Sequence, residues 1–466
     1  MTLPSSCVSK HHLRISPSPK LLFFILSTCC FTLLILFEIQ SLHTSSPSPS
    51  RSFFQQWQNR TLAQDLSSLN EKLRLSVTFL PLKDLRYSKK PLEGHTWFMS
   101  SMYDTHQEGE VQYQEFPSEA SHGRLLCLKG HETHEGSSNY YALAWPDALP
   151  FNATLVKGLT FVAYNHYDYH NIWHSLGAFF PFVAWHKMNG CESPERWVLF
   201  QKGELRLKTN PWLNTLMGAT FGREPYIEVF DWVKDEEPVC FEKAVVMRHN
   251  EGGMSRARRM EAYDLIRCKA RVYCNLNLER RIPEIGMTML MRTGARSFNN
   301  ETAVIEIFER ECRRVDGCRL MVAYANNLTV CDQVKLMSLT DILISPHGAQ
   351  LTNLFLMDRN SSIMEFYPKG WLKLAGVGQY VYRSMSSWAG MRHQGAWRDP
   401  DGEHCPYPDD DGRCMSVYKN GRIGYNETFF TEWTRNVLIQ VKARKLEEAA
   451  SREDQSDSAS NTCHCG

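Results

Sequence analysis

The chain has 466 residues, 43% of them hydrophobic and 12% aromatic, which favours a globular protein of about two domains. Its formal charge of +1 lacks the basic excess of most nucleic-acid-binding proteins, so that class is disfavoured.

The first predicted element is an uncharged apolar run, Leu21–Phe37. Three lysines or arginines precede this run, and none follows it before Arg51. A positive flank on one side predicts a cytosolic tail over residues 1–20 and a single transmembrane signal anchor over residues 21–39, with the remainder of the chain luminal. A cleaved signal peptide is the alternative, but the 17-residue run is long for one and no Ala-x-Ala-like site follows it.

Residues 40–90 are expected to form a stem. Gln40–Ser52 is rich in serine and proline, which favours an extended and poorly ordered segment, and Gln64–Leu75 is compatible with a short helix.

Twelve of the 15 cysteines follow the predicted anchor, which fits an oxidising lumen. Two pairs are close enough in sequence to close small loops, Cys312 with Cys318 and Cys405 with Cys414, but spacing does not define the full connectivity. No Cys-x-x-Cys pair occurs, so no zinc site is predicted. Glycosylation is predicted at the asparagines of six Asn-x-Ser/Thr sequons, namely Asn59, Asn152, Asn300, Asn327, Asn360 and Asn426.

The first half of the luminal region is mixed in character. Leu159–Tyr164, Trp197–Phe200 and Lys243–Arg248 have the composition of strands, and Ile172–Trp185 is apolar enough for a buried helix.

The second half alternates more regularly. The predicted elements are strand Met287–Met291, helix Glu301–Arg314, strand Leu320–Ala325, helix Cys331–Met337, strand Ile342–Ile344, helix Leu351–Leu356, strand Ile363–Phe366 and, later, helix Thr431–Arg444. This alternation predicts a doubly wound α/β domain over residues 286–445, followed by a disordered polar tail over residues 446–466. Ligands of such domains bind beyond the carboxyl ends of the strands.

The segment Ser345–Asn353, Ser-Pro-His-Gly-Ala-Gln-Leu-Thr-Asn, lies at one such strand end. Pro346 stops the strand, and Gly348 permits a close backbone approach. The free N–H groups of a helix that begins here would face an anion such as a diphosphate, and His347 would add a donor or a proton. An ordinary strand-loop-helix corner is the alternative reading.

Two further polar residues lie at strand ends of the same domain. The guanidinium of Arg292 suits two parallel hydrogen bonds to phosphate oxygens, although a surface ion pair explains it equally well in isolation. The carboxylate of Glu365 suits the two hydroxyls of a ribose, or else a cap or a salt bridge.

In the first half, Asn165–His174 is dense in titratable side chains, and a histidine suits general-base work near neutral pH. His166 and His170 are four residues apart, but no His-Glu-x-x-His pattern accompanies them, so a metal pair is disfavoured. Asp409–Asp411 is interpreted as a solvated loop rather than as a metal-binding Asp-x-Asp motif.

Four stretches together resemble the family 61 glycosyltransferases of plants: Leu290–Gly294, Ile344–Asn353, Met364–Pro368 and, more loosely, Asn171–His174. The resemblance extends over residues 164–380, and the Ser-Pro-His-Gly-Ala run is its most specific part. The predicted anchor and stem match the architecture of that family.

The resemblance implies an α/β, GT-B-like fold in which two Rossmann-like domains face a cleft, with the acceptor-side domain over residues 91–285 and the nucleotide-sugar donor domain over residues 286–445. It implies a type II Golgi membrane enzyme that inverts the anomeric carbon, uses a UDP-sugar and requires no metal or other cofactor. It places Glu365 at the ribose and His174 on the acceptor side. The remaining residues that it assigns to substrate binding are Arg292, Ser345, His347, Gly348, Ala349, Gln350 and Asn353.

The chain departs from the family pattern at Ala178, where many members carry an aspartate. His174 is therefore the first candidate for the catalytic base and Asp168 the second, and a changed or lost activity is the third possibility.

The predicted function is transfer of a pentose, xylose or arabinose, from a UDP-sugar to a cell-wall polysaccharide such as xylan or to a glycoprotein glycan. One alternative is a catalytically silent luminal protein that binds nucleotide sugars or glycans. Another is a transferase that uses UDP-N-acetylglucosamine.

Overall fold

The computed structural model describes residues 28, 32–33, 49–82, 113–165, 168–234, 237–247, 254–276, 284–371, 376–402, 404–453, 463 and 465. The expected cytosolic tail over residues 1–20 lies outside this set, as does nearly all of the expected anchor over residues 21–39. None of the helices in the described part of the chain combines the length and apolar character that a membrane crossing requires.

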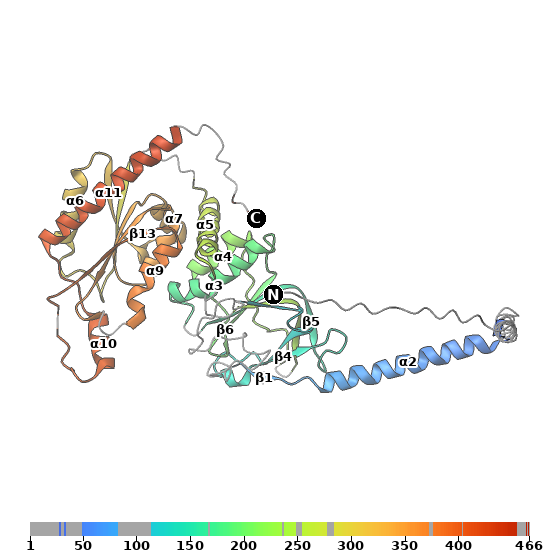
Figure 1. Cartoon of the computed structure of the whole chain (residues 1–466). Coiled ribbons are helices and arrows are strands. Elements are labelled where there is room, and N and C mark those ends of the chain that lie inside the picture. Colours follow the sequence, from blue (N-terminus) through green and yellow to red (C-terminus); the bar gives the residue numbers. More distant parts are fainter. Residues whose placement is uncertain are drawn as a thin grey trace, which may run out of the picture. The chain divides into compact units, whose positions relative to one another are not determined.

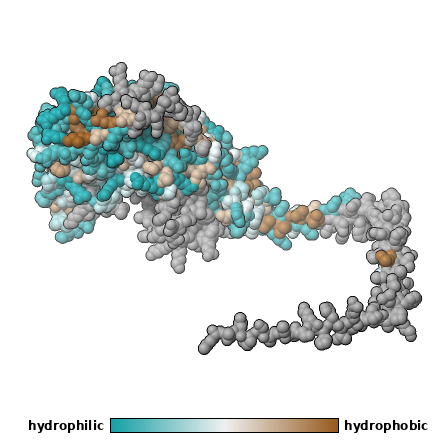
Figure 2. All heavy atoms as spheres, turned by 45° about the horizontal axis from the view of Figure 1, so that its top comes forward, coloured by the Kyte–Doolittle hydropathy of each residue, from teal (hydrophilic) through white to brown (hydrophobic). Residues whose placement is uncertain are grey.

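The stem region contains a helix longer than the sequence predicted. Helix α2 spans Pro49–Leu75, so it includes Gln64–Leu75 and also begins before the expected end of the extended segment at Ser52. Leu62, Leu66 and Leu69 are exposed on it, and Figure 2 shows apolar side chains among polar ones on the surface of this helix.

The first half of the remaining chain forms an eight-stranded mixed sheet with the strand order β1-β4-β3-β8-β5-β6-β7, and β2 pairs with β8 off this path. The strands are β1 Leu80–Pro81, β2 Tyr113–Phe116, β3 Leu125–Lys129, β4 Tyr140–Ala144, β5 Thr154–Asn165, β6 Arg196–Gln201, β7 Glu204–Leu205 and β8 Val239–Met247. Only β5 pairs in parallel, with β6 and with β8, and the other described pairs are antiparallel. The expected Rossmann-like sheet is therefore present only as a parallel centre with antiparallel additions.

Three helices follow the strands of this half: α3 Ile172–Met188, α4 Pro211–Phe221 and α5 Arg256–Tyr273. Each has a side chain that caps its N-terminus, since Asn171, Asn210 and Ser255 accept hydrogen bonds from the first-turn backbone. Helix α3 is buried over most of its length, as its apolar sequence predicted.

The second half forms a five-stranded, fully parallel sheet with the order β10-β9-β11-β12-β13. Its strands are β9 Ile285–Met291, β10 Cys318–Tyr324, β11 Ile342–Pro346, β12 Ser362–Tyr367 and β13 Arg392–Arg398. Counted along the chain the order is 2-1-3-4-5, a doubly wound arrangement whose direction reverses between β9 and β11. The predicted doubly wound domain is confirmed, and the reversal point marks where a ligand is expected.

Helices connect these strands and cover the sheet. They are α6 Glu301–Arg313, η4 Ala325–Asn327, α7 Val330–Ser338, η5 Ala349–Leu356, η6 Gly376–Tyr380, α9 Val381–Trp388, α10 Asp411–Asn420 and α11 Glu427–Glu453, and a short η3 Gly136–Ser138 lies in the first half. Helices α6 and α11 pack together on one face of the sheet (Figure 1), where Val437 and Val441 are buried. The expected boundary at residue 446 falls within α11, which continues to Glu453.

The two halves share one hydrophobic core. Side chains of α3, α4 and α5 pack in a single cluster with those of α7, η5 and α9. Buried polar contacts cross the same junction: the indole Nε1 of Trp212 donates to Asn353 Oδ1 at 2.9 Å, and Arg267 Nε donates to the Phe355 carbonyl at 2.8 Å. The junction is therefore held by packing and by directional bonds.

Six disulfides connect described cysteines. The predicted pairs Cys312–Cys318 and Cys405–Cys414 are confirmed, and the others are Cys127–Cys240, Cys191–Cys465, Cys268–Cys463 and Cys274–Cys331. Cys463 and Cys465 are thus bonded to the folded region, which the prediction of a disordered tail did not include.

Candidate active site

The site lies at the carboxyl ends of β9 and β11, where the strand order reverses. Arg292 follows the last residue of β9, and His347 follows the last residue of β11. The Nη1 atom of Arg292 donates to the His347 carbonyl at 3.3 Å. A Cβ atom on Gly348 would lie 2.2 Å from the same Nη1 atom, so the glycine is what lets the guanidinium lie against the loop.

The loop after β11 is held by its own side chains. Ser345 Oγ donates to the Leu290 carbonyl at 2.9 Å, and Gln350 Nε2 donates to the Pro346 carbonyl at 2.9 Å. Ala349 begins η5, a 3₁₀-helix where an α-helix was expected, and no side chain caps its first turn. The predicted residues from Ser345 to Gln350 therefore converge with Arg292 on one loop, with helix-start N–H groups beside a cation.

A second arginine belongs to this site. Arg296 is half-buried, and its guanidinium lies 5.0 Å from the ring centre of the buried Trp371. Burial and the neighbouring charge of Arg292 lower the pKa of Arg296 to about 10, and burial likewise lowers the pKa of Arg292. No carboxylate among the described residues forms an ion pair with either arginine.

Several donors around the two arginines are buried without an acceptor. Within the described part of the chain, the Nε atoms of Arg292 and Arg296 and the Nε1 atom of Trp371 have no hydrogen-bond partner. Such groups cost roughly 1–3 kcal/mol each when left unpaired, and more when charged. Three unpaired donors and two excess positive charges in one place suit a bound anion with several oxygens, such as a diphosphate.

His347 sits in an aromatic enclosure and is only 7% exposed. Its ring stacks on Tyr367 with 4.8 Å between centroids, and it also contacts Trp371 and Tyr382. Its Nδ1 atom lies 2.6 Å from Glu365 Oε1.

Glu365 is fully buried, with 0% exposure, and both of its oxygens face imidazoles. Its Oε2 atom lies 2.9 Å from Nε2 of His393, in β13. Burial raises the pKa of the Glu365 carboxyl, but the hydrogen bonds to His347 and His393 lower this pKa by more than burial raises it. The net shift is downward, and the group is a carboxylate. The contact between Glu365 and a ribose stays a prediction, and both oxygens already have partners here.

Asn353 lies behind the loop and is 1% exposed. Its Oδ1 atom accepts from Trp212, and its Nδ2 atom donates to Gln333 Oε1 at 2.9 Å. The side chain is thus fully engaged in joining α4 to η5, which gives Asn353 a structural reason for its position.

The predicted base candidates lie at the start of α3. Burial lowers the pKa of His174, which favours the neutral imidazole that a base requires, and the charge of Asp168 opposes this shift in part. Asp168 Oδ1 accepts from the backbone N–H groups of His170 and Asn171 at 2.9 and 3.0 Å. Burial raises the pKa of Asp168, but these hydrogen bonds lower it by more than burial raises it, so Asp168 is ionised. Ala178 is buried in α3 at 6% exposure, and His166 lies outside the described residues.

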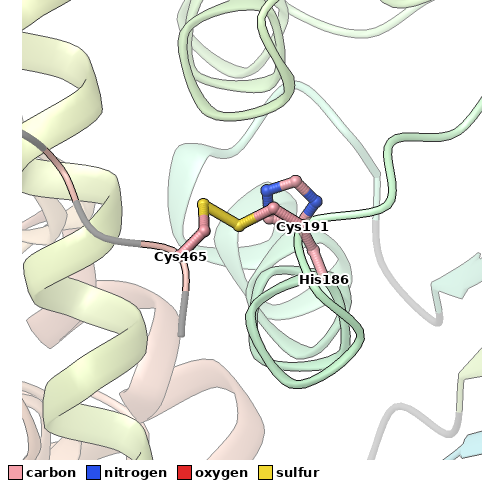
Figure 3. A group of neighbouring side chains, drawn as sticks. All are labelled: His186, Cys191 and Cys465. Carbon is pink, nitrogen blue, oxygen red and sulfur yellow. A yellow bond between two sulfur atoms is a disulfide. The ribbon is translucent and has the colours of Figure 1, made fainter.

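One cluster of metal-ligating atoms occurs among the described residues. His186, Cys191 and Cys465 come together, but the two sulfur atoms are bonded to each other (Figure 3) and are not available as thiolates. Asp409, Asp410 and Asp411 are exposed as predicted, but the predicted loop ends at Asp410, which caps helix α10, and Asp411 begins that helix.

All six sequon asparagines are exposed, as an attached glycan requires.

Sequence reasoning missed the residues that complete the site, namely Arg296, Tyr367, Trp371, Tyr382 and His393. Of these, Arg296 gave a readable signal as a second arginine four residues after Arg292, and Tyr367 lay within the stretch Met364–Pro368 that resembles the family.

The family model described as Glycosyltransferase 61 matches residues 139–364. The match covers both base candidates, both arginines and the loop after β11, and ends immediately before Glu365. No curated protein matches the chain. The match confirms the resemblance seen in the motifs: residues 139–364 match the glycosyltransferase 61 family, whose reaction moves a sugar from a donor to an acceptor.

Proposed function

We propose that the protein transfers a sugar, with inversion, from a UDP-sugar to a glycan acceptor. The observation that supports this most is the pair of half-buried guanidiniums, Arg292 and Arg296, beside the loop at the reversal point of the parallel sheet. A nucleoside diphosphate is the leaving group of such a reaction, and it carries the oxygens that the unpaired donors lack.

In this reaction the bond between the anomeric carbon and the diphosphate oxygen breaks, and its electron pair stays on the diphosphate. Arg292, Arg296 and the N–H groups at the start of η5 stabilise that charge, as a metal ion does in metal-dependent transferases. An acceptor hydroxyl forms the new bond from the opposite face, and its proton passes to a base. His174 is the proposed base because its imidazole is neutral, and Asp168 is the second candidate.

The finer assignments follow the family resemblance and the sequence. The proposed donor is UDP-xylose or a UDP-arabinose, and the proposed acceptor is a wall polysaccharide or a glycoprotein glycan. The proposed location is the Golgi membrane, with a single type II anchor over residues 21–39 and a luminal catalytic region. The disulfides and the exposed sequon asparagines support passage through an oxidising compartment.

The donor assignment is tested by thermal stabilisation of the full-length protein in EDTA. UDP-xylose, UDP-arabinopyranose, UDP-arabinofuranose and UDP-N-acetylglucosamine are compared, and one of the pentose donors is expected to raise the unfolding temperature most. Arg292→Ala and His347→Ala should abolish the effect, whereas Arg319→Ala, an exposed arginine on β10, should retain it. Full stabilisation of a folded Arg292→Ala protein would remove the donor-site assignment.

A catalytically silent sugar-binding protein is the second candidate, and Ala178 is the observation that favours it. Such a protein would bind a UDP-sugar as above but transfer no radiolabelled sugar to any glycan acceptor. Transfer of radiolabelled sugar by the wild type that is lost in His174→Ala would exclude this second candidate.

A further inference from the structure

The proton positions in the buried group His347–Glu365–His393 follow from its hydrogen bonds. The backbone N–H of Gly395 donates to His393 Nδ1 at 3.3 Å. A backbone N–H has only a donor role, so Nδ1 of His393 carries a lone pair and its proton resides on Nε2. That Nε2–H then donates to Glu365 Oε2 at 2.9 Å.

The hydrogen bonds of Glu365 also determine where the proton on His347 lies. Glu365 is ionised, so both of its oxygens are acceptors and the Nδ1 atom of His347, 2.6 Å from Oε1, must carry a proton. The tautomer of the site histidine is thus determined by a chain of bonds that begins at the backbone of β13.

The remaining ring nitrogen of His347 is the one left for a ligand. Nε2 lies on the opposite edge of the ring from Nδ1, and among the described residues no hydrogen bond is made to it. Stacking on Tyr367 fixes the plane of the ring, and Arg292 binds the carbonyl of the same residue. The groups of fixed or titratable charge around the ring are Glu365, His393, Arg292, Arg296, Tyr367 and Tyr382.

We infer that Glu365 and His393 are positioning residues that hold a proton on Nδ1 of His347, so that when the nucleotide binds, Nε2 takes up a second proton and donates it to a phosphate oxygen. The identity of the ligand in this inference rests on the proposed function. The proton positions rest only on the hydrogen bonds. The carboxylate serves here to orient and balance a cationic donor, because a buried imidazolium needs a compensating charge. In the sequence, His393 had no motif to identify it, since β13 is a polar edge strand.

The test is nitrogen-15 NMR of the histidine-labelled full-length protein, with the His347 signals assigned by loss in His347→Gln. The wild type should show a protonated Nδ1 at His347. In Glu365→Gln the amide oxygen must accept from His393 Nε2–H, so the amide nitrogen faces His347 and should move its proton to Nε2. A wild-type His347 that carries its proton on Nε2 alone overturns the inference.

Calorimetric titration with UDP in EDTA gives the second readout. Glu365→Gln should weaken UDP binding about tenfold, because a neutral imidazole replaces a charge-assisted donor. A purely structural role would lower the unfolding temperature of Glu365→Gln but leave the His347 tautomer and the UDP affinity of the folded protein unchanged, which would also overturn the inference. If the wild type shows the expected tautomer but does not bind UDP, the proposed function is contradicted. The proton assignment would still hold.

Discussion

At the scale of single residues, the unpaired donors distinguish this site from a structural corner. Arg292, Arg296 and Trp371 place buried N–H groups where no described residue accepts from them. The buried Arg267, by contrast, has a carboxylate partner: it bonds to Asp264, to the Phe355 carbonyl and to the Ala389 carbonyl. A partly buried arginine with no carboxylate partner and an unpaired Nε is better explained by a ligand than by the fold.

Gly348 supplies a prediction at this scale. Gly348→Ala would place Cβ 2.2 Å from Arg292 Nη1 and 2.6 Å from Gln350 Oε1, and both of these atoms end flexible side chains. The guanidinium should therefore move away from the loop, with at least a tenfold loss of UDP affinity and little change in unfolding temperature. Calorimetry and thermal denaturation measure the two effects.

Gly412→Ala is the matched control, because Gly412 lies in the exposed first turn of α10, where a Cβ would meet only Asp410 Oδ1 at 3.4 Å. Equal UDP affinity of Gly348→Ala and wild type would show that the close approach has no role in binding.

Glu365 predicts a pH dependence of stability. Its pKa in the folded protein is lowered from 4.5, so its bonds contribute stability that is fully present above this value and is lost as the pH falls through the lowered pKa. The difference in unfolding temperature between wild type and Glu365→Gln should be largest near neutral pH and should shrink below about pH 4.5. A difference that is constant from pH 7 to pH 4 contradicts the assigned charge state.

At the scale of elements, helices and strands were predicted best from the sequence where the hydrophobic pattern was local. Each strand of the second half from Met287 to Phe366 is confirmed, because short apolar runs separated by amphipathic helices have few other solutions. In the first half β5, β6, β8 and α3 were predicted, whereas β1 to β4 were not, since these strands are too short to show a clear alternating pattern. His393 was missed because its role depends on the pairing of β13 with β12, the strand that carries Glu365, and not on any local motif.

The contact between α4 and η5 gives a prediction at this scale. Trp212→Phe removes the donor to Asn353 Oδ1 and leaves a buried acceptor unpaired, which should cost about 1–3 kcal/mol of unfolding free energy in denaturant titrations. Because Asn353 has a structural role here, Asn353→Ala should lower stability by a similar amount and change UDP affinity only slightly. A large loss of UDP binding in a stable Asn353→Ala protein would restore it as a ligand residue.

At the scale of the whole molecule, the exposed sequons and the disulfides are consistent with the proposed luminal location. Each of the six sequon asparagines lies on the surface, two of them at the helix starts of α6 and α11, where Asn300 and Asn426 accept backbone N–H groups. Their amide nitrogens remain available for a glycan, since the capping bonds use the oxygens.

Glycosylation of these sites is testable by peptide mass spectrometry after enzymatic deglycosylation in heavy-oxygen water. Protein from a secretory host should show conversion to labelled aspartate at several of the six positions, Asn152, Asn327 and Asn360 among them. Complete absence of label would contradict the luminal assignment.

The central claim is that two arginines at the reversal point of the parallel sheet hold a nucleoside diphosphate without a metal. The most direct test is calorimetric titration of UDP in EDTA into the full-length wild type, Arg296→Ala and the exposed-surface control Arg319→Ala. Loss of a charge-assisted contact worth about 1.5–3 kcal/mol predicts roughly 10- to 150-fold weaker binding in Arg296→Ala and wild-type affinity in Arg319→Ala. Wild-type affinity in a folded Arg296→Ala protein would contradict the claim.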